Sequence, residues 1–447
     1  MTTTEVNSPT HSISETIYEK ARKVLPGGIS RNSIYRKPHP FYVDSAKGCY
    51  IKDIEGAEKI DFANNMASLI HGHAHPVIIE AVTKQLQRGS AFNLGTTMEV
   101  RYAEHLCGRN KSFQNVRFVN SGSEAVLGLI KTARAYTNKP KIAKAEGAYH
   151  GVYDFAEVSQ TSNPSNWGDL DKPNSVPVAA GTPKGVINNV VVFPYNDVER
   201  TLRILNQHKD DIACVLIDPV PHRIGMIPAT KEFVNALYKW TRENGSLLAF
   251  DEVITFRTEY GGAQERYDVQ SDLTSMAKII GGGFPGGAIA GSSDIMGVMD
   301  PSAKKLLLPH SGTFSGNPVT MTAGRLAMEM YDREAVKKLN ALTSVAIKQI
   351  EEAIKIADIP ACVTGAGSLF RVHLKEKPPT HYREAYMDSR TSMLLAKLLN
   401  YLYANGIIMM NTCSAALSTV MTQVEIDRLS ETLLNGFKLI KSDIENK

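Results

Sequence analysis

Lys278 has the sequence surroundings of a reactive lysine. Apolar residues flank it on both sides, and a glycine-dense loop follows it at residues 281–287. Apolar surroundings disfavour the charged ammonium, so the neutral amine becomes available to form a Schiff base with a carbonyl compound. The alternative is an ordinary lysine that runs along an apolar surface and keeps its ammonium in water. No Gly-Lys-Ser/Thr sequence follows the glycines, so the loop is not a nucleotide-binding P-loop.

Two acidic residues, Asp251 and Glu252, follow the apolar run at residues 247–250. Open α/β sheets bind ligands at the carboxyl ends of their strands, and a carboxylate buried there needs a cation or a hydrogen-bond donor. Asp251 is therefore a candidate partner for a cationic group of a ligand. Capping of the next turn by this aspartate is the alternative.

The sequence Asn-Ser-Gly-Ser-Glu at residues 120–124 stands between an apolar strand and a helical repeat of apolar residues. The N-terminus of a helix presents free N–H groups and the positive end of the helix dipole, which together bind phosphate. Gly122 would let the backbone approach such an anion, and the hydroxyls of Ser121 and Ser123 could add hydrogen bonds. Plain helix capping by one of the two serines is the alternative.

Two more polar motifs could contact a flat, phosphorylated ligand. Tyr149 and His150 follow an apolar strand, and the tyrosine ring could stack on a planar group. Thr313, in the polar loop at residues 310–318, could reach a phosphate oxygen. Each motif taken alone is equally typical of an ordinary core, rim or loop position.

Histidines alternate at positions 71, 73 and 75, a spacing that places three imidazoles on one face of a strand. However, Gly72 and Pro76 interrupt a strand, and no acidic or cysteine ligand is adjacent. We therefore predict no metal site.

The elements that must position these residues alternate between strand and helix. Apolar runs predict short strands, and helical spacing of apolar residues predicts helices between them; the strands are expected at 116–119, 142–145, 190–193, 214–217 and 247–250, and the helices at 76–88, after 124 and at 231–244. Strands that are apolar throughout are typical of a mostly parallel sheet covered on both faces, so the fold class is α/β. Residues 163–185 show no periodicity and are expected to be a lid or a floppy insertion.

We predict three parts along the chain. Residues 1–75, with short strands at 41–62, form an N-terminal segment that packs with the small domain. Residues 76–332 form the large ligand-binding domain, and residues 333–447 form a smaller C-terminal α+β domain. The boundary falls in or beside a long helical stretch that runs from about residue 317 to residue 357.

Composition excludes several classes of protein. The net charge of the 447 residues is +4 and no Lys/Arg block occurs, which argues against a nucleic-acid partner. The five cysteines form no CxxC pair, which excludes a disulfide framework and indicates a reducing, cytoplasmic location. No apolar run reaches the ~18 residues of a membrane helix, and Met1–Ser14 lacks the apolar stretch of a secretory signal and is expected to be a flexible start.

One cofactor would use all of the first motifs together. Pyridoxal phosphate (PLP) needs a Schiff-base lysine, an acid at its pyridine nitrogen, a phosphate cup and a stacking group. The acid must be ionised so that the ring nitrogen stays protonated and the ring accepts electrons from the substrate.

These motifs, in this order, resemble the class III (omega) aminotransferase family of fold type I PLP-dependent enzymes. The resemblance extends from about Leu25 to the C-terminal helices, and its anchors are Asn-Ser-Gly-Ser-Glu-Ala at 120–125, Tyr-His-Gly at 149–151, Phe-Asp-Glu-Val at 250–253, Ala277-Lys278 with the glycine loop, and Gly-Thr-Phe-Ser-Gly-Asn-Pro at 312–318. Within the family, the chain is most similar to the glutamate-1-semialdehyde aminomutases and the β-amino-acid aminotransferases. The fold implied is a mostly parallel central sheet in a large domain, with a smaller α+β domain.

The resemblance implies a role for each motif. Lys278 would be the Schiff-base and proton-transferring lysine and Asp251 the partner of the pyridine nitrogen, which makes these two the catalytic residues. The resemblance also implies phosphate binding by Ser121, Gly122 and Ser123, and ring contacts by Tyr149, His150 and Val253. Asp218 stands at an acidic cofactor-binding position where the family usually has Glu. Thr313 would reach the phosphate of the neighbouring subunit of a homodimer.

The resemblance is weaker at the substrate-binding positions than at the cofactor-binding ones. In the β-amino-acid branch an arginine after Pro-Gly binds the substrate carboxylate, and Arg31 matches that position; a surface arginine is the alternative. Met66 stands where the aminomutases have a bulky aromatic residue, and the loop at 411–417 lacks the acidic residue that they carry. Arg257 could point into the site or support it from behind.

The resemblance predicts a PLP-dependent aminotransferase. It would move an amino group between an amino donor, either an amine or an amino acid with β- and ω-amino acids among the candidates, and a keto acid or aldehyde. The alternative is the intramolecular isomerase, glutamate-1-semialdehyde 2,1-aminomutase, which needs no second substrate. A non-catalytic protein of the same fold is a third alternative, but it should lack Lys278 or Asp251, and this chain has both.

Overall fold

A seven-stranded sheet forms the centre of the protein. The computed structural model describes residues 12–445, and the strands of this sheet follow the order β4 (Asn115–Val119), β12 (Gly287–Gly291), β11 (Leu273–Ala277), β10 (Leu247–Asp251), β9 (Ile212–Ile217), β5 (Lys141–Ala145) and β8 (Val190–Phe193). Only β12 runs antiparallel to its neighbours, and all other pairs are parallel. The predicted α/β class with a mostly parallel sheet is confirmed.

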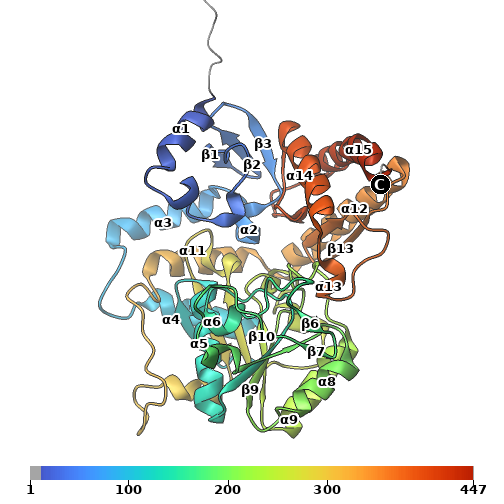
Figure 1. Cartoon of the computed structure of the whole chain (residues 1–447). Helices are drawn as coiled ribbons and strands as arrows, with labels where there is room; N and C mark the ends of the chain where they lie inside the picture. Colours follow the sequence, from blue (N-terminus) through green and yellow to red (C-terminus); the bar gives the residue numbers. More distant parts are fainter. Residues whose placement is uncertain (1–11, 446–447) are drawn as a thin grey trace, which may run out of the picture.

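Helices cover both faces of the central sheet. In Figure 1, β9 and β10 lie between α5 (Gly122–Thr137) on one side and α8 (Val198–Asn206) and α9 (Lys231–Glu243) on the other. Alternate residues of β8 face opposite layers: Val190 and Val192 pack in the core beneath α5, whereas Val191 and Phe193 pack in the core beneath α8 and α9. Burial on both faces explains why these strands are apolar throughout.

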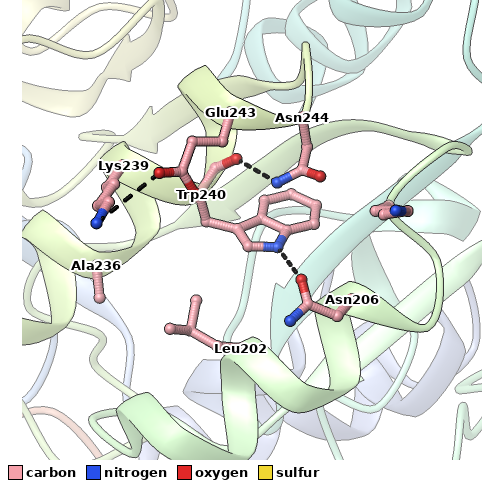
Figure 2. A pocket seen from close by; sticks show the side chains of 8 residues that line it. Leu202, Asn206, Ala236, Lys239, Trp240, Glu243 and Asn244 are labelled. Atoms are coloured by element: carbon pink, nitrogen blue, oxygen red, sulfur yellow. Dashed lines mark hydrogen bonds and ion pairs between the residues drawn. The ribbon is translucent and has the colours of Figure 1, made fainter.

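Trp240 fills the space between α8 and α9 on the outer side of the sheet. Its indole N–H donates to Asn206 Oδ1 over 2.7 Å (Figure 2). Around it lies an open groove of about 570 Å³. None of the groove's lining residues belongs to the predicted site, so the groove carries no part of the functional argument.

The N-terminal strands join the C-terminal part of the chain. Strands β1 (Val43–Lys47), β2 (Tyr50–Asp53) and β3 (Glu58–Asp61) are antiparallel, and β15 (Ile407–Ile408) pairs in parallel with β3. A second small sheet contains β13 (Cys362–Ala366), β14 (Leu369–His373) and β16 (Ser414–Ala416). The shared sheet is consistent with the N-terminal segment belonging to the small domain, although the domain limits themselves stay a prediction.

The remaining helices connect or flank these sheets. They are α1 (Ile13–Ala21), α2 (Asn64–Ala67), α3 (Pro76–Arg88), α4 (Thr97–Arg109), α6 (Asp154–Glu157), α7 (Lys184–Ile187), α10 (Ser293–Met296), α13 (Tyr382–Ala385), α14 (Ser389–Ala404) and α15 (Gln423–Glu445). Within residues 12–445, no helix combines the length and the apolarity needed to cross a bilayer.

The long helical stretch expected at 317–357 is in fact two helices. α11 (Pro318–Met330) ends before Tyr331, and α12 (Arg333–Ala357) begins after Asp332. Asp332 has an extended backbone and caps α12, because its Oδ1 accepts the N–H of Ala335 over 2.8 Å. The sequence pattern missed this cap because apolar residues continue at helical spacing across it.

Residues 163–185 are not floppy. They contain a hairpin of β6 (Gly168–Asp169) and β7 (Lys172–Pro173), and Arg383 donates hydrogen bonds to the carbonyls of Trp167, Gly168 and Asp169. A flexible start is expected from the sequence at residues 1–14, of which residues 1–11 lie outside the described part of the chain. For residues 12–14 the expectation is wrong, because Ser12 caps α1 and Ser14 is buried.

Candidate active site

Lys278 stands at the carboxyl end of β11, inside the edge of the central sheet. Its φ of +51° lies in the left-handed region, which costs a non-glycine residue of order 1–3 kcal/mol and is concentrated at functional sites. Burial lowers the pKa of the Lys278 amine, and the nearby charges of Asp251 and Asp218 oppose that shift. The position therefore favours a neutral amine, as the sequence surroundings predicted.

Asp251 ends β10, the strand next to β11, directly across from Ser275. Its carboxylate is buried and accepts three hydrogen bonds, from His150 Nδ1 (2.8 Å), Ser275 Oγ (3.1 Å) and the Val253 N–H (3.0 Å). Donors that favour the charged form keep a carboxylate ionised. Asp251 and Lys278 thus meet at the carboxyl ends of adjacent parallel strands, where such sheets bind ligands.

Asp218 follows β9, the next strand of the sheet. It is buried and accepts the N–H of Val220 at Oδ1 over 2.9 Å. Burial and the charge of Asp251 raise the pKa of Asp218 well above its usual range. The two carboxyl groups therefore differ in their surroundings, because Asp251 accepts three hydrogen bonds whereas Asp218 accepts one and is pushed toward its neutral form.

The predicted phosphate cup lies at the first turn of α5, a helix of 16 residues. Ser121 is its N-cap, and its Oγ accepts the N–H of Glu124 over 3.2 Å, so the capping alternative holds for this serine. Gly122 lies so close to Val253 that an added Cβ would approach Val253 Cγ1 to 2.9 Å. Ser123 Oγ accepts the Val152 N–H over 3.2 Å.

Tyr149 and His150 approach from the segment that follows β5. His150 is buried and bonded to Asp251, and its Nε2 has no partner among the described residues. Tyr149 is 41% exposed, and the guanidinium carbon of Arg223 lies 5.3 Å from its ring centroid. Thr313 is exposed and has no hydrogen bond to the residues around Lys278 within residues 12–445.

A cavity of about 630 Å³ lies between the N-terminal segment and the rest of the chain. Arg31, Met66 and Gly282–Gly283, just after the Lys278 turn, line its wall, together with mainly apolar side chains such as Phe41 and Met410. Arg31 is exposed, and its Nη1 donates to Asn65 Oδ1 over 2.8 Å. Neither Lys278 nor Asp251 belongs to the wall of this cavity.

Residues 64–67 form a left-handed turn at this wall. Their φ values are +45°, +48°, +57° and +69°, although none of them is glycine. Asp61 Oδ1 accepts the N–H groups of Ala63 and Asn64, and the Asn64 side chain donates to the carbonyl of Ala416. Since each such residue costs roughly 1–2 kcal/mol, the turn persists only because these contacts hold it.

The hydrogen bonds of Arg257 favour the second of its two predicted roles, support of the site from behind, over substrate binding. Arg257 is fully buried, and it donates from Nε to Ser368 Oγ (2.8 Å), from Nη1 to the carbonyl of Ala67 (3.0 Å) and from Nη2 to the carbonyl of Leu417. Burial lowers the pKa of its guanidinium to about 10. Arg257 therefore supports the turn that carries Met66 and does not face a substrate.

We expect Arg257→Ala to lower the free energy of unfolding by about 3 kcal/mol, because three carbonyl or hydroxyl acceptors lose a charged donor and a cavity remains. Urea unfolding measures this change. Arg203→Ala, which removes a surface ion pair with Asp171, is the matched control and should cost at most about 1 kcal/mol. Equal stability of the two variants would contradict the supporting role of Arg257.

The side chains of the alternating histidines form hydrogen bonds with different residues of this chain. His71 bonds to Thr419 Oγ1 and to the carbonyl of Ala327, each over 2.8 Å, and His73 Nε2 bonds to Asp61 Oδ2 over 2.8 Å. Within residues 12–445, no three or more His, Cys, Asp or Glu side chains form a group that could hold a metal ion.

Two supports of the site were missed in the sequence. Ser275 opposes Asp251 across the ladder, and the strand pairing would have revealed it. Lys144 is fully buried on β5, although its position between Ala143 and Ala145 looks like that of any strand lysine. No sequence signal distinguishes this lysine from a solvent-facing one.

Residues 33–440 of the chain match the family model of class-III aminotransferases. Glutamate-1-semialdehyde 2,1-aminomutase from Methanococcus maripaludis is 36% identical over 398 residues, covering 88% of this chain and 90% of the relative. An omega-transaminase from Sphaerobacter thermophilus is 43% identical, with a TM-score of 0.94 over 96% of this chain and 98% of that one. A β-phenylalanine aminotransferase from Variovorax paradoxus is 27% identical, with a TM-score of 0.86 over 96% and 94% of the two chains.

Proposed function

The chain belongs to the class-III aminotransferase family, whose cofactor is PLP, and from this premise we propose that it transfers an amino group between an amino acid and a keto acid or aldehyde. The observation that carries the proposal is the meeting of a neutral-favouring lysine with a triply hydrogen-bonded carboxylate at adjacent strand ends. PLP supplies, when bound, the carbonyl that takes the amino group and a ring that accepts an electron pair from the substrate.

The residues at the sheet edge fit that cofactor. The first turn of α5 offers free N–H groups for a phosphate, and the absence of a side chain at Gly122 lets Val253 pack against this turn. The carboxylate of Asp251 would keep the pyridine nitrogen protonated, while Tyr149 and Val253 would enclose the ring. Thr313 would complete the phosphate site of a second subunit.

Lys278 would carry out the proton transfer. Its neutral Nζ takes a proton from the substrate carbon that bears the amino group and returns it at the carbon that receives the amino group. Burial raises the pKa of Asp218, so Asp251, with its three hydrogen-bond donors, is the better candidate for the negative group beside the ring nitrogen.

A carboxylate-bearing substrate is supported by Arg31. Its guanidinium lies at the wall of the cavity, and Asn65 orients it. The apolar lining of the cavity favours an apolar side chain on the same substrate. A β-amino acid of this type agrees with the similarity to the β-phenylalanine aminotransferase of Variovorax paradoxus.

We expect Arg31→Ala to raise the KM for amino-acid substrates by about 10- to 100-fold, because a charged pair with the substrate carboxylate is lost. Simple amines, which lack the carboxylate, should keep their KM. Steady-state kinetics on both substrate classes measures the difference. Asn65→Ala should give a smaller rise, and an equal loss on amines and amino acids would remove the carboxylate-binding role.

The intramolecular aminomutase is a second candidate, because a relative of that name aligns with this chain over 90% of its own length. Met66 and the loop at 411–417, which lacks an acidic residue, argue for the transferase instead. Stoichiometry separates the two, since a mutase turns over with glutamate 1-semialdehyde alone, whereas a transferase stops after one half-reaction without an acceptor.

A donor–acceptor screen tests the proposed function. The visible absorption of the PLP-loaded protein is followed while α-, β- and ω-amino acids, simple amines and glutamate 1-semialdehyde are added, each followed by a keto acid. Bleaching by a β-amino acid and recovery with a keto acid support the proposal. Turnover of glutamate 1-semialdehyde without acceptor would replace it with the mutase.

We further propose a homodimer located in the cytoplasm. Several exposed apolar side chains lie on α3 and on the loops before α4 and before α11: Val77, Leu86, Phe92, Leu94, Leu307 and Phe314. Such side chains favour contact with a second copy, which would also bring in Thr313. All five cysteines are free, in keeping with a reducing compartment.

A further inference from the structure

The segment from Glu146 to Val158 connects the two ends of the candidate site. It leaves the sheet after β5 and carries Tyr149 and His150. His150 bonds to Asp251, at the proposed ring nitrogen, and the Val152 N–H bonds to Ser123, at the proposed phosphate. The position of this segment therefore determines how Tyr149, the Asp251 carboxylate and the first turn of α5 lie relative to one another.

One buried side chain holds both ends of this segment. Lys144 Nζ donates to the carbonyl of Ala148 over 2.9 Å and to the carbonyl of Val158 over 2.6 Å. Lys144 is fully buried, and its neighbours in the adjacent strands are Val192 and Leu216. No carboxylate forms an ion pair with it in the described part of the chain.

The two acceptors match a neutral amine. A neutral amine has two N–H groups and the two carbonyls use both, whereas an ammonium would leave its third N–H without a partner. Burial, assisted by the charge of Arg223, lowers the pKa of Lys144 to about 7, while Glu157 opposes the shift. His150 also faces Lys144, and its pKa is lowered mainly by its own burial.

Stability alone does not explain a lysine here. A buried amine must be desolvated, and an apolar side chain of similar length would fill the same space without that cost. We propose that Lys144 is a positioning residue for the cofactor ring, because its amine ties Ala148 and Val158 to β5 and so fixes Tyr149 and His150. The consequence for the ring rests on the proposed function, whereas the effect on the segment does not.

Lys144→Met tests this proposal, with Lys141→Met as the matched control. Lys141 lies on the same strand but pairs with Asp211 at the surface. In cofactor-free protein, we expect amide hydrogen exchange at residues 148–158 to be about tenfold faster in Lys144→Met, with unchanged exchange in β9, in line with the loss of one or two hydrogen bonds. The dissociation constant for PLP should rise about tenfold as well. Lys141→Met should change neither quantity.

The pH dependence separates positioning by this amine from general packing. When the segment opens, the pKa of the Lys144 amine returns toward its ordinary value of 10.5. Between pH 7 and 10 the opened form therefore binds the proton more tightly than the closed form. The protection of residues 148–158, relative to β9, should therefore rise as the pH rises above 7 in the wild type. Lys144→Met should lack this rise.

Three results would overturn the proposal. The first is exchange at 148–158 in Lys144→Met equal to that of the wild type. The second is an equal increase in β5, β8 and β9, which would indicate a merely structural role. The third is a wild-type protein in which the protection of residues 148–158, relative to β9, does not change with pH. This result can be obtained even if Lys144→Met does not fold. A wild type that binds no PLP would instead remove the proposed function and leave the exchange result standing.

Discussion

Lys278→Ala should lose turnover by a factor of about 10⁴ or more, because the same amine both joins the cofactor and moves the proton. The variant should also lose the visible absorption that PLP acquires when it is bound through a lysine. The substitution should be tolerated by the fold, because the Lys278 amine donates no side-chain hydrogen bond to the described residues and its removal leaves no buried acceptor unpaired.

Absorption spectra and single-turnover kinetics measure the two losses. Lys239→Ala, which removes an exposed lysine paired with Glu243 on α9 (Figure 2), is the control and should retain both properties. A Lys278→Ala protein that kept its absorption band and its turnover would show that the reactive amine lies elsewhere.

Asp251→Asn should lower turnover by about 10² to 10³, since a neutral amide no longer holds the proton on the ring nitrogen. The fold should tolerate the change. The amide oxygen can still accept from Val253 and Ser275, and the amide NH₂ can donate to His150 Nδ1, because the free Nε2 allows the imidazole to carry its proton there. Cofactor binding and the thermal midpoint should therefore change far less than turnover.

Asp218→Asn provides the matched comparison. Burial and the charge of Asp251 raise the pKa of Asp218 and so favour its neutral form, which an uncharged amide reproduces. We expect a loss of at most about tenfold, the effect of one altered hydrogen bond. Similar large losses in both variants would contradict the assignment of the negative charge to Asp251.

The sequence predicted the central sheet well and singled out the residues at its edge, for a physical reason. Strands buried on both faces are apolar throughout, and the polar residues that follow them stand out against that background. Asp251 and Lys278 were found in this way, and the helix at 76–88 has the predicted limits.

Contacts between distant residues could not be predicted in the same way. Arg257 lies in a motif shared with the family, but its partners are Ser368 and the carbonyls of Ala67 and Leu417, which only the folded chain brings together. The direction in which an arginine points is set by such partners and not by its neighbours in sequence. The break between α11 and α12 was missed because one capping aspartate outweighs a continuous apolar pattern.

The left-handed turn at residues 64–67 has a consequence for the order of assembly. Asp61 lies close to this turn in sequence, but the turn's other partners, Arg257 and the carbonyl of Ala416, lie about 190 and 350 positions further along the chain. During synthesis, the N-terminal strands emerge long before either partner exists. The wall that carries Met66 can therefore take its final shape only after the C-terminal part of the chain has been made.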